Sequence, residues 1–192
     1  MPARETDARG VLPANSRRRL RATLRGLARA VLLAFLIAHA RPAGAETFKP
    51  FALKTLDGQP RSLSDVQGKV TLVVFFFPSC VYCNTSLPVL QKLYDEYRGR
   101  GLAMVWINIV PEQEAKIPAW QEKFGYQGPV LVGATQKSLQ KDYGLTMTPA
   151  HFLLGPQRKV LYKHFGYKAG DEKKLEVQIQ KALEVASSSA SG

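Results

Sequence analysis

The only two cysteines of the 192-residue chain, Cys80 and Cys83, lie in the stretch PSCVYC. They follow a run of bulky apolar residues, 70–77, and precede a segment with the spacing of an amphipathic helix. The first turn of a helix offers N–H groups without intrahelical partners and the positive end of the helix dipole, and both stabilise a thiolate. A cysteine in a Cys-x-x-Cys pair can therefore have a pKa well below the usual value of about 8.5.

This placement indicates thiol–disulfide exchange. We expect Cys80, at the start of the helix, to attack or be attacked and so to form a mixed disulfide with a partner. Cys83 lies about one helical turn further on, and we expect it to sit deeper and to close the Cys80–Cys83 disulfide. Two packed cysteines or an inert disulfide would not need this strand-to-helix corner. A zinc site is a weaker alternative, because one Cys-x-x-Cys without a second pair supplies half of the ligands.

A second motif, TMTP at residues 146–149, stands directly before a predicted strand. Proline can begin a strand at its edge. If the Thr148–Pro149 bond is cis, the backbone of Thr148 lies opposite the cysteines and can pair with an extended substrate segment.

His151 has two interpretations. It is either a hydrogen-bonded histidine within the sheet, or a residue that tunes Cys80 or completes a copper site with the two cysteines.

Strands and helices alternate along the segment that carries these motifs. The run 70–77 lacks polar alternation, which suits a strand buried on both faces of a parallel or mixed sheet. Further strands are predicted at 102–110 and 129–134, and a hairpin at 150–155 and 159–166. A first helix is predicted after the cysteines, with Leu87, Leu90, Tyr94 and Tyr97 on one face, and a second from Pro118 to Phe124. A third is predicted over 135–144 with Thr135 as N-cap, and a last one around Leu175, Ile179 and Leu183. Short extended pieces precede them between 48 and 63. This order predicts a three-layer α/β/α sandwich with a mixed central β-sheet.

The first 45 residues have the features of an export signal. Basic residues lead into an apolar core at 30–40, and small residues follow at 43–45. We predict a signal peptide at 1–45, one domain at 46–186 and a disordered tail at 187–192. An uncleaved membrane anchor stays open, as does twin-arginine export through Arg17 and Arg18, although Sec-type export is the default. Export implies a periplasmic or extracellular location, where disulfides persist, and two cysteines are too few for a disulfide scaffold.

The net charge of +12 comes mostly from this first segment. Residues 1–45 hold nine arginines against two acidic residues, so residues 46–192 carry 18 basic against 13 acidic residues, a net of +5. No long basic stripe with interleaved aromatic residues appears there. We therefore predict no nucleic-acid partner.

The sequence resembles the thioredoxin fold in its order of apolar strand, Cys-x-x-Cys, helix with Pro88, and Thr-Pro before a hairpin. FALKTLDGQPRSLSDVQGKVTLVVFFFPSCVYC is similar to the entry of the exported TlpA/ResA-like thiol–disulfide oxidoreductases, and YGLTMTPAHFLLGPQRKVLYKHFGY is similar to their closing segment. The resemblance covers about residues 48–184. It implies that Cys80 is the exposed nucleophile, Cys83 the resolving thiol and Pro149 the cis-proline.

The sequence also departs from that group. Ser79 replaces the tryptophan common before the first cysteine, and Val74 stands where thioredoxin has a buried acid. Ser86 takes the position at which ResA-like proteins often have Glu, so a proton relay to Cys83 needs water or another group. Val81-Tyr82 replaces Gly-Pro and looks more like the disulfide isomerases. We predict that Tyr82 contacts the substrate.

The resemblance implies reduction of specific protein disulfides, such as those of apocytochrome c or of copper sites. The partners would be cysteine-containing proteins and a membrane thiol that donates electrons. We predict no metal and no cofactor beyond a redox-active Cys80–Cys83 disulfide.

The alternatives to this reductase are a disulfide oxidase or isomerase, and a copper-binding module that uses the cysteines with His151. A peroxidase is disfavoured, because no Thr stands two or three residues before Cys80.

Overall fold

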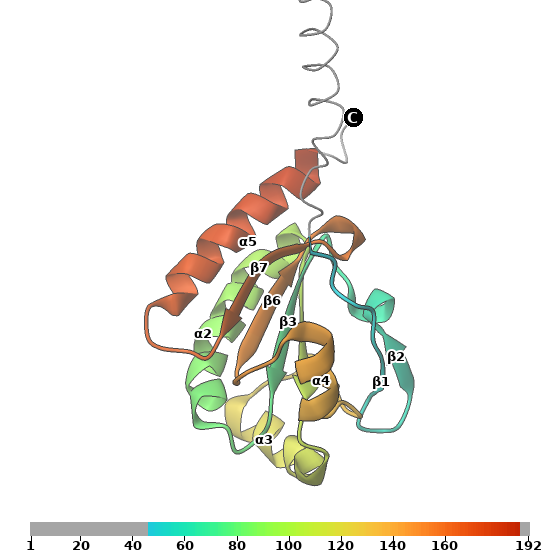
Figure 1. Cartoon of the computed structure of the whole chain (residues 1–192). Coiled ribbons are helices and arrows are strands. Elements are labelled where there is room, and N and C mark those ends of the chain that lie inside the picture. Colours follow the sequence, from blue (N-terminus) through green and yellow to red (C-terminus); the bar gives the residue numbers. More distant parts are fainter. Residues whose placement is uncertain (1–45, 189–192) are drawn as a thin grey trace, which may run out of the picture. The chain divides into compact units, whose positions relative to one another are not determined.

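The computed structural model describes residues 46–188, so the predicted signal segment 1–45 lies outside the described residues, as do residues 189–192. The elements are β1 (Ala52–Lys54), β2 (Pro60–Ser62), β3 (Val70–Phe76), α2 (Val81–Tyr97), β4 (Leu102–Asn108), α3 (Ile117–Phe124), β5 (Val130–Leu131), α4 (Gln136–Tyr143), β6 (Ala150–Leu154), β7 (Val160–Phe165) and α5 (Asp171–Ser188) (Figure 1). Helix α5 includes Ser187 and Ser188, the first two residues of the predicted tail.

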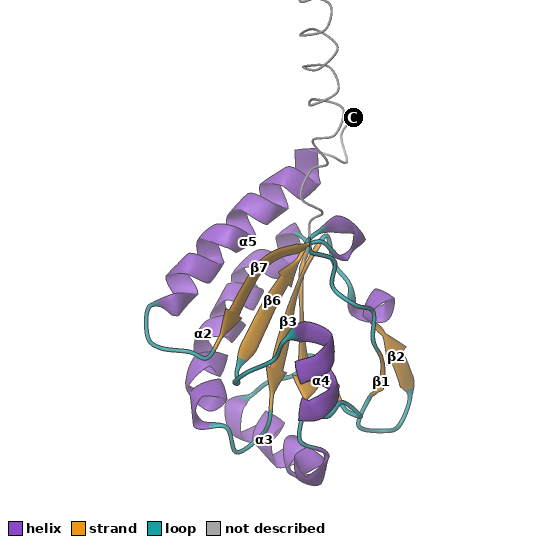
Figure 2. Cartoon of the chain, viewed as in Figure 1, coloured by secondary structure: helices purple, strands orange, loops and turns teal. Residues whose placement is uncertain are grey.

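The central sheet has the strand order β5-β4-β3-β6-β7, and β3, β6 and β7 are seen next to one another in Figure 2. β3 is parallel to β4 and antiparallel to β6, while β4 is parallel to β5 and β6 forms an antiparallel hairpin with β7. The sheet is therefore mixed, as predicted. All seven residues of β3 are buried, which explains why its sequence lacks polar alternation.

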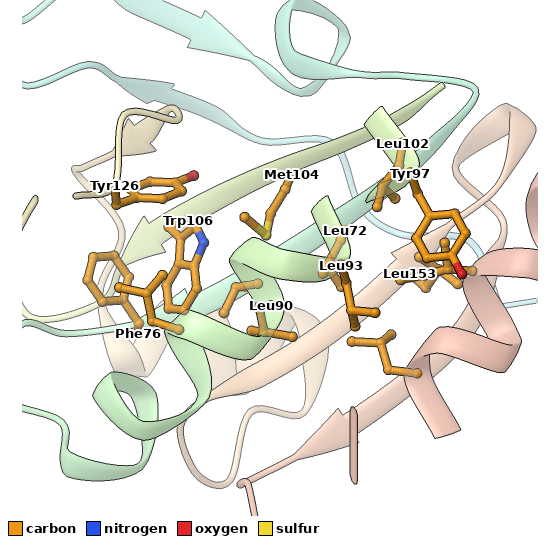
Figure 3. Close-up of a cluster of buried hydrophobic side chains, with 14 of the residues drawn as sticks. Leu72, Phe76, Leu90, Leu93, Tyr97, Leu102, Met104, Trp106, Tyr126 and Leu153 are labelled. Atoms are coloured by element: carbon orange, nitrogen blue, oxygen red, sulfur yellow. The ribbon is translucent and has the colours of Figure 1, made fainter. Parts of the chain in front are cut away.

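Successive residues of β3 point into two different cores. Leu72, Val74 and Phe76 belong to a cluster with residues of α2, α3 and α5, part of which Figure 3 shows. Val73 and Phe75 belong to a second cluster, with α4 and the N-terminal segment. Helices thus cover both faces of the sheet, and the prediction of a three-layer α/β/α sandwich is confirmed.

The helices α3 and α4 end where glycine allows a left-handed backbone. Gly125 follows α3 with φ of 63°, and Gly144 follows α4 with φ of 66°. At its start, α4 has the predicted N-cap, since the Thr135 hydroxyl accepts a hydrogen bond of 3.2 Å from the Ser138 N–H. Helix α3 starts at Ile117, one residue earlier than predicted, with Pro118 in its first turn.

The strand predicted at 129–134 is shorter in the structure, because its later residues pair elsewhere. β5 includes only Val130 and Leu131. The N–H of Val132 donates to the carbonyl of Lys54 at 2.8 Å, and the N–H of Lys54 donates back at 3.1 Å. Val132 therefore joins the small β1–β2 sheet to the end of β5, a contact between residues far apart in the sequence.

Every helix within residues 46–188 is too short or too polar to cross a membrane.

Candidate functional site

Strand β3 and helix α2 meet at the cysteines. The chain leaves β3 after Phe76, and the Cys80 N–H donates to the Phe77 carbonyl at 3.0 Å in a tight turn. Cys80 is the N-cap of α2, with φ −72° and ψ 110°, and its carbonyl accepts from the Asn84 N–H at 3.0 Å. Its sulfur accepts a hydrogen bond of 3.2 Å from the Cys83 N–H. The predicted strand-to-helix corner is thus present, and a free N–H of the first turn points at the Cys80 sulfur.

Cys80 and Cys83 form a disulfide with an S–S distance of 2.11 Å and a Cα–Cα distance of 5.2 Å. Cys83 is fully buried, with 0% of its surface exposed, and it packs in the cluster beneath α2. Cys80 is 5% exposed, less than the exposed nucleophile that the resemblance implied. Of the two cysteines, the N-cap residue thus keeps the larger exposed fraction.

The segment before β6 faces the disulfide from the opposite side. The Thr148–Pro149 peptide bond is cis, and the Thr148 hydroxyl lies 3.5 Å from the Cys80 sulfur. Pro149 is buried, and its carbonyl accepts a hydrogen bond of 2.7 Å from the Gly166 N–H at the end of β7. Thr148 and Pro149 therefore lie beside Cys80, as the sequence motif predicted.

An exposed apolar rim, formed by Val81, Tyr82 and Met147, flanks the disulfide on two segments. These residues are 71%, 62% and 56% exposed, whereas most large apolar side chains of the domain are buried. Met147 packs against Gly166, where a side chain would come within 2.9 Å of its sulfur. The exposure of Tyr82 leaves it free to contact a substrate. Met147 was not predicted as a site residue; it directly precedes Thr148, whose hydroxyl lies 3.5 Å from the Cys80 sulfur.

The buried side of α2 next to Cys83 carries a hydroxyl and an aliphatic side chain. Ser86 is fully buried, and its hydroxyl donates to the Cys83 carbonyl at 2.9 Å. Val74 lies in the same cluster as Cys83. Both positions are thus occupied by groups that do not ionise near neutral pH.

A network that the sequence did not predict fixes the first turn of α2. The Asn84 side chain donates to the Pro78 carbonyl at 3.0 Å and accepts from the Trp120 indole N–H at 2.7 Å. The Ser79 N–H donates to the side chain of Gln113 at 3.0 Å. These bonds connect the loop before Cys80 to α3 and to the 3₁₀ segment Pro111–Lys116. The only sign of this network in the sequence is Asn84, a polar residue directly after Cys83.

His151 lies on β6, in register with Val74 of β3 and His164 of β7. It is buried, and its Nε2 atom has no hydrogen-bond partner among the described residues, so the hydrogen bond expected from the sequence is absent at this nitrogen. Burial, helped by the nearby His164, lowers the pKa of His151 from 6.5 to about 3. The two rings stack with centres 6.2 Å apart. His151 is thus neutral at physiological pH.

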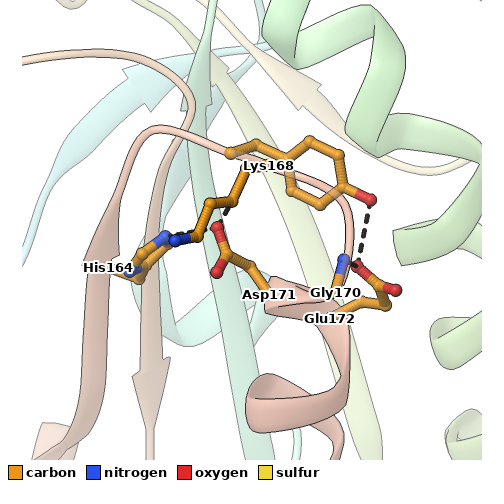
Figure 4. A network of polar contacts seen from close by, with 6 residues as sticks. His164, Lys168, Gly170, Asp171 and Glu172 are labelled. Atoms are coloured by element: carbon orange, nitrogen blue, oxygen red, sulfur yellow. Dashed lines mark hydrogen bonds and ion pairs between the residues drawn. The ribbon is translucent and has the colours of Figure 1, made fainter.

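His164 belongs to a polar network at the start of α5 (Figure 4). Its Nε2 atom lies 3.1 Å from a carboxylate oxygen of Asp171, which also accepts from the Lys168 N–H at 3.0 Å. Although burial opposes ionisation, these hydrogen bonds lower the pKa of Asp171 below its usual value.

Within residues 46–188, no group of three or more His, Cys, Asp or Glu side chains is placed to hold a metal ion. The copper site considered from the sequence is therefore not preformed.

Comparison with known proteins places this site in a family. The Redoxin family pattern matches residues 42–179. Thioredoxin-like protein YneN of Bacillus subtilis is 30% identical over 118 residues, which are 60% of this chain and 68% of the relative. Thiol-disulfide oxidoreductase ResA of Geobacillus thermodenitrificans is 28% identical over 118 residues, 62% of this chain and 67% of the relative.

A solved structure gives the same result for the fold. The crystal structure of a putative thiol:disulfide interchange protein DsbE from Chlorobium tepidum matches with a TM-score of 0.65 and 26% identity, covering 72% of this chain and 96% of that one. The chain therefore belongs to the Redoxin family and is a TlpA/ResA-like thiol–disulfide oxidoreductase of the thioredoxin superfamily.

Proposed function

We propose that this oxidoreductase is exported and reduces specific disulfides of other proteins, with Cys80 as the nucleophile and Cys83 as the resolving thiol. The observation that carries the proposal is the disulfide between an N-cap cysteine and a fully buried one, with Thr148–Pro149 beside it. The apolar run with basic flank and small-residue end in 1–45 supports export. Protein targets with cysteines, such as those of cytochrome c maturation or copper sites, fit this location.

In the reducing direction, the reaction starts from the dithiol form. The Cys80 thiolate attacks one sulfur of the substrate disulfide, forms a mixed disulfide and releases the other substrate sulfur as a thiolate. The Cys83 thiolate then attacks the Cys80 sulfur, which releases the second substrate thiolate and restores the Cys80–Cys83 disulfide. Two electrons have passed to the substrate, and its thiolates take up the two protons. A dithiol donor returns the enzyme to its reduced form, and a membrane thiol protein is our proposed donor.

The geometry around Cys80 favours its thiolate as the attacking group. The Cys83 N–H lies 3.2 Å from the Cys80 sulfur, and a hydrogen bond to a charged sulfur is stronger than one to a thiol. The helix dipole acts in the same direction. Cys83 lacks exposed surface, so a substrate disulfide meets Cys80 first and Cys83 reacts only after the mixed disulfide has formed.

Substrate binding involves the groups that surround Cys80. The backbone of Thr148 can pair with an extended segment of the substrate next to its cysteine, as in other cases in which a peptide adds to an exposed strand end. Tyr82 and the rest of the apolar rim contact the side chains of that segment. A site of this kind accepts an unfolded or extended cysteine-bearing chain more readily than a folded surface.

The direction of electron flow is tested by the reduction potential of the Cys80–Cys83 pair, measured by equilibration with glutathione. A reduction potential of about −270 mV, like that of thioredoxin, supports the reductase. A reduction potential of about −120 mV, like that of DsbA, would contradict the reductase and indicate a disulfide oxidase. The same samples, assayed for reshuffling of a scrambled substrate, report isomerase activity.

A further inference from the structure

A groove of about 210 Å³ lies against the residues that flank the two cysteines in the sequence, namely Pro78 and Ser79 before Cys80 and Asn84 after Cys83. One wall includes Pro78 and Ser79, the two residues before Cys80, and the other is formed by α3. Trp120 and Lys123 are spaced to face the same side of α3, and Lys116, the N-cap residue of this helix, precedes Trp120 by one helical turn. A chain whose cysteine reacts with Cys80 can therefore continue along the surface into this groove.

The floor of the groove is apolar and fixed in place. Trp120 is buried, and its indole N–H already donates to Asn84, which in turn donates to the Pro78 carbonyl. Phe124 is half-buried and adds an aromatic side chain. Because these polar groups are satisfied within the domain, the groove is formed before a partner arrives, and less ordering is required on binding.

The charge of the groove is positive. Lys116 and Lys123 are exposed, and no residue of the lining is acidic. The Lys123 ammonium lies 5.3 Å from the centre of the Phe124 ring, a cation–π contact that keeps it at the groove. Within the described part of the chain, no ion pair joins either lysine to a carboxylate. Glu112 and Glu122 belong to the same segment but do not line the groove.

We propose that this groove is a specificity subsite that binds acidic residues of the substrate chain close to its reacting cysteine. The inference rests on the proposed function and adds the substrate class, namely cysteine-bearing segments flanked by Asp or Glu. Lys116 and Lys123 are separated by two helical turns, about 10 Å along the axis, which is the span of about three residues of an extended chain. The exchange chemistry at Cys80 is unchanged, and the lysines raise the rate at which an acidic segment is captured and oriented.

The test uses three disulfide-linked peptides that are identical except for Glu, Gln or Lys at the positions two to four residues on either side of the cysteine. At low ionic strength we expect kcat/KM to be about 2- to 30-fold higher for the Glu peptide than for the Gln peptide, the range for two exposed charge pairs. The double variant Lys116→Gln/Lys123→Gln should lose this preference, and Lys116→Glu/Lys123→Glu should prefer the Lys peptide.

The matched control is Lys137→Gln/Lys141→Gln on α4, which removes the same charge on the other face of the sheet and should keep the preference. Equal rates for all three peptides, or an equal change of all rates in the Lys116/Lys123 variants, would overturn the subsite. Binding of labelled peptides with Ser in place of Cys gives a readout without chemistry. Lysine-dependent binding of the Glu peptide without any exchange would refute the proposed function alone, whereas exchange without charge preference would refute the subsite alone.

Discussion

Cys80 and Cys83 belong to one helical turn but lie in different surroundings. Cys80 caps α2, keeps 5% of its surface exposed and lies beside Thr148, whereas Cys83 is fully buried, although both belong to the apolar cluster beneath the helix. This difference in exposure supports the proposed roles, in which Cys80 exchanges with the partner and Cys83 reacts only with Cys80.

Substitution of each cysteine should separate these roles. Cys80→Ser should reduce the rate of insulin disulfide reduction to background, because no accessible thiolate remains. Cys83→Ser should accumulate mixed disulfides with substrates, since the resolving thiol is missing, and these are visible on non-reducing gels. Full activity of Cys80→Ser would refute the assignment of the nucleophile.

His151 links stability to pH through its burial. In the unfolded chain its pKa is about 6.5, and in the folded domain it is about 3, because burial and His164 disfavour the charged ring. The unfolded state therefore binds more protons below pH 6.5, so the stability due to the neutral ring is complete above that pH and is lost progressively as the pH falls toward 3. Asp171, which pairs with His164, opposes part of this effect.

His151→Leu should make the unfolding free energy less dependent on pH. From pH 7 to pH 5, the wild-type domain should lose roughly 2 kcal/mol more than the variant, at about 1.36 kcal/mol per pH unit below the unfolded pKa. Urea unfolding at the two pH values measures this difference. Parallel losses in both proteins would show that His151 does not titrate in this way.

At the scale of elements, α3 fixes the start of α2. Asn84, in the first turn of α2, bonds to Trp120 of α3 and to the Pro78 carbonyl. Trp120 packs in turn on Phe76 at the end of β3, with ring centres 4.6 Å apart. The position of Cys80 is thus determined by three elements, of which only β3 and α2 are adjacent to it in the sequence.

Asn84→Ala should destabilise the domain by about 1–3 kcal/mol, because the buried indole N–H of Trp120 loses its partner. Thr85→Ala is the matched control, since this exposed neighbour bonds only to the Val81 carbonyl of its own helix, and it should change stability by less than about 0.5 kcal/mol. Urea unfolding measures both. An equal, small effect of the two substitutions would count against the role of Asn84.

Much of the element order could be predicted, because it depends on local patterns. The unbroken apolar run of β3, the cap at Thr135 and the hairpin around 156–158 were readable from neighbouring residues. The early end of β5 and the Asn84–Trp120 bond could not be predicted, because they arise from pairing between segments far apart in the sequence. The same limit applies to Met147, which comes near the cysteines only because the fold places its neighbour Thr148 beside Cys80.

At the scale of the whole domain, the segment from Glu46 to Ser62 crosses one face of the sheet and belongs to its core. Phe48 is fully buried and packs on Tyr143 and Phe152, with ring centres 4.4 and 5.4 Å away. These contacts connect the N-terminal segment to α4 and β6. The part of the chain just after the predicted signal therefore contributes to the stability of the fold.

Phe48→Ala should lower the free energy of unfolding by about 3–5 kcal/mol, the cost of removing a buried phenylalanine. Phe51→Ala is the matched control, because this side chain is only partly buried, and it should cost less. Thermal and urea unfolding of the oxidised protein measure both. A loss below about 1 kcal/mol for Phe48→Ala would show that the segment is not part of the core.

The pairing of this same segment has a consequence for self-association. Near its start, the Glu46 carbonyl accepts from the Val160 N–H of β7, and further on Lys54 pairs with Val132 beside β5. These are the two outermost strands of the sheet, and unpaired outer strands are sites where β proteins aggregate. Proteolytic loss of residues 46–54 should therefore remove these pairings and increase self-association of the domain through its outer strands.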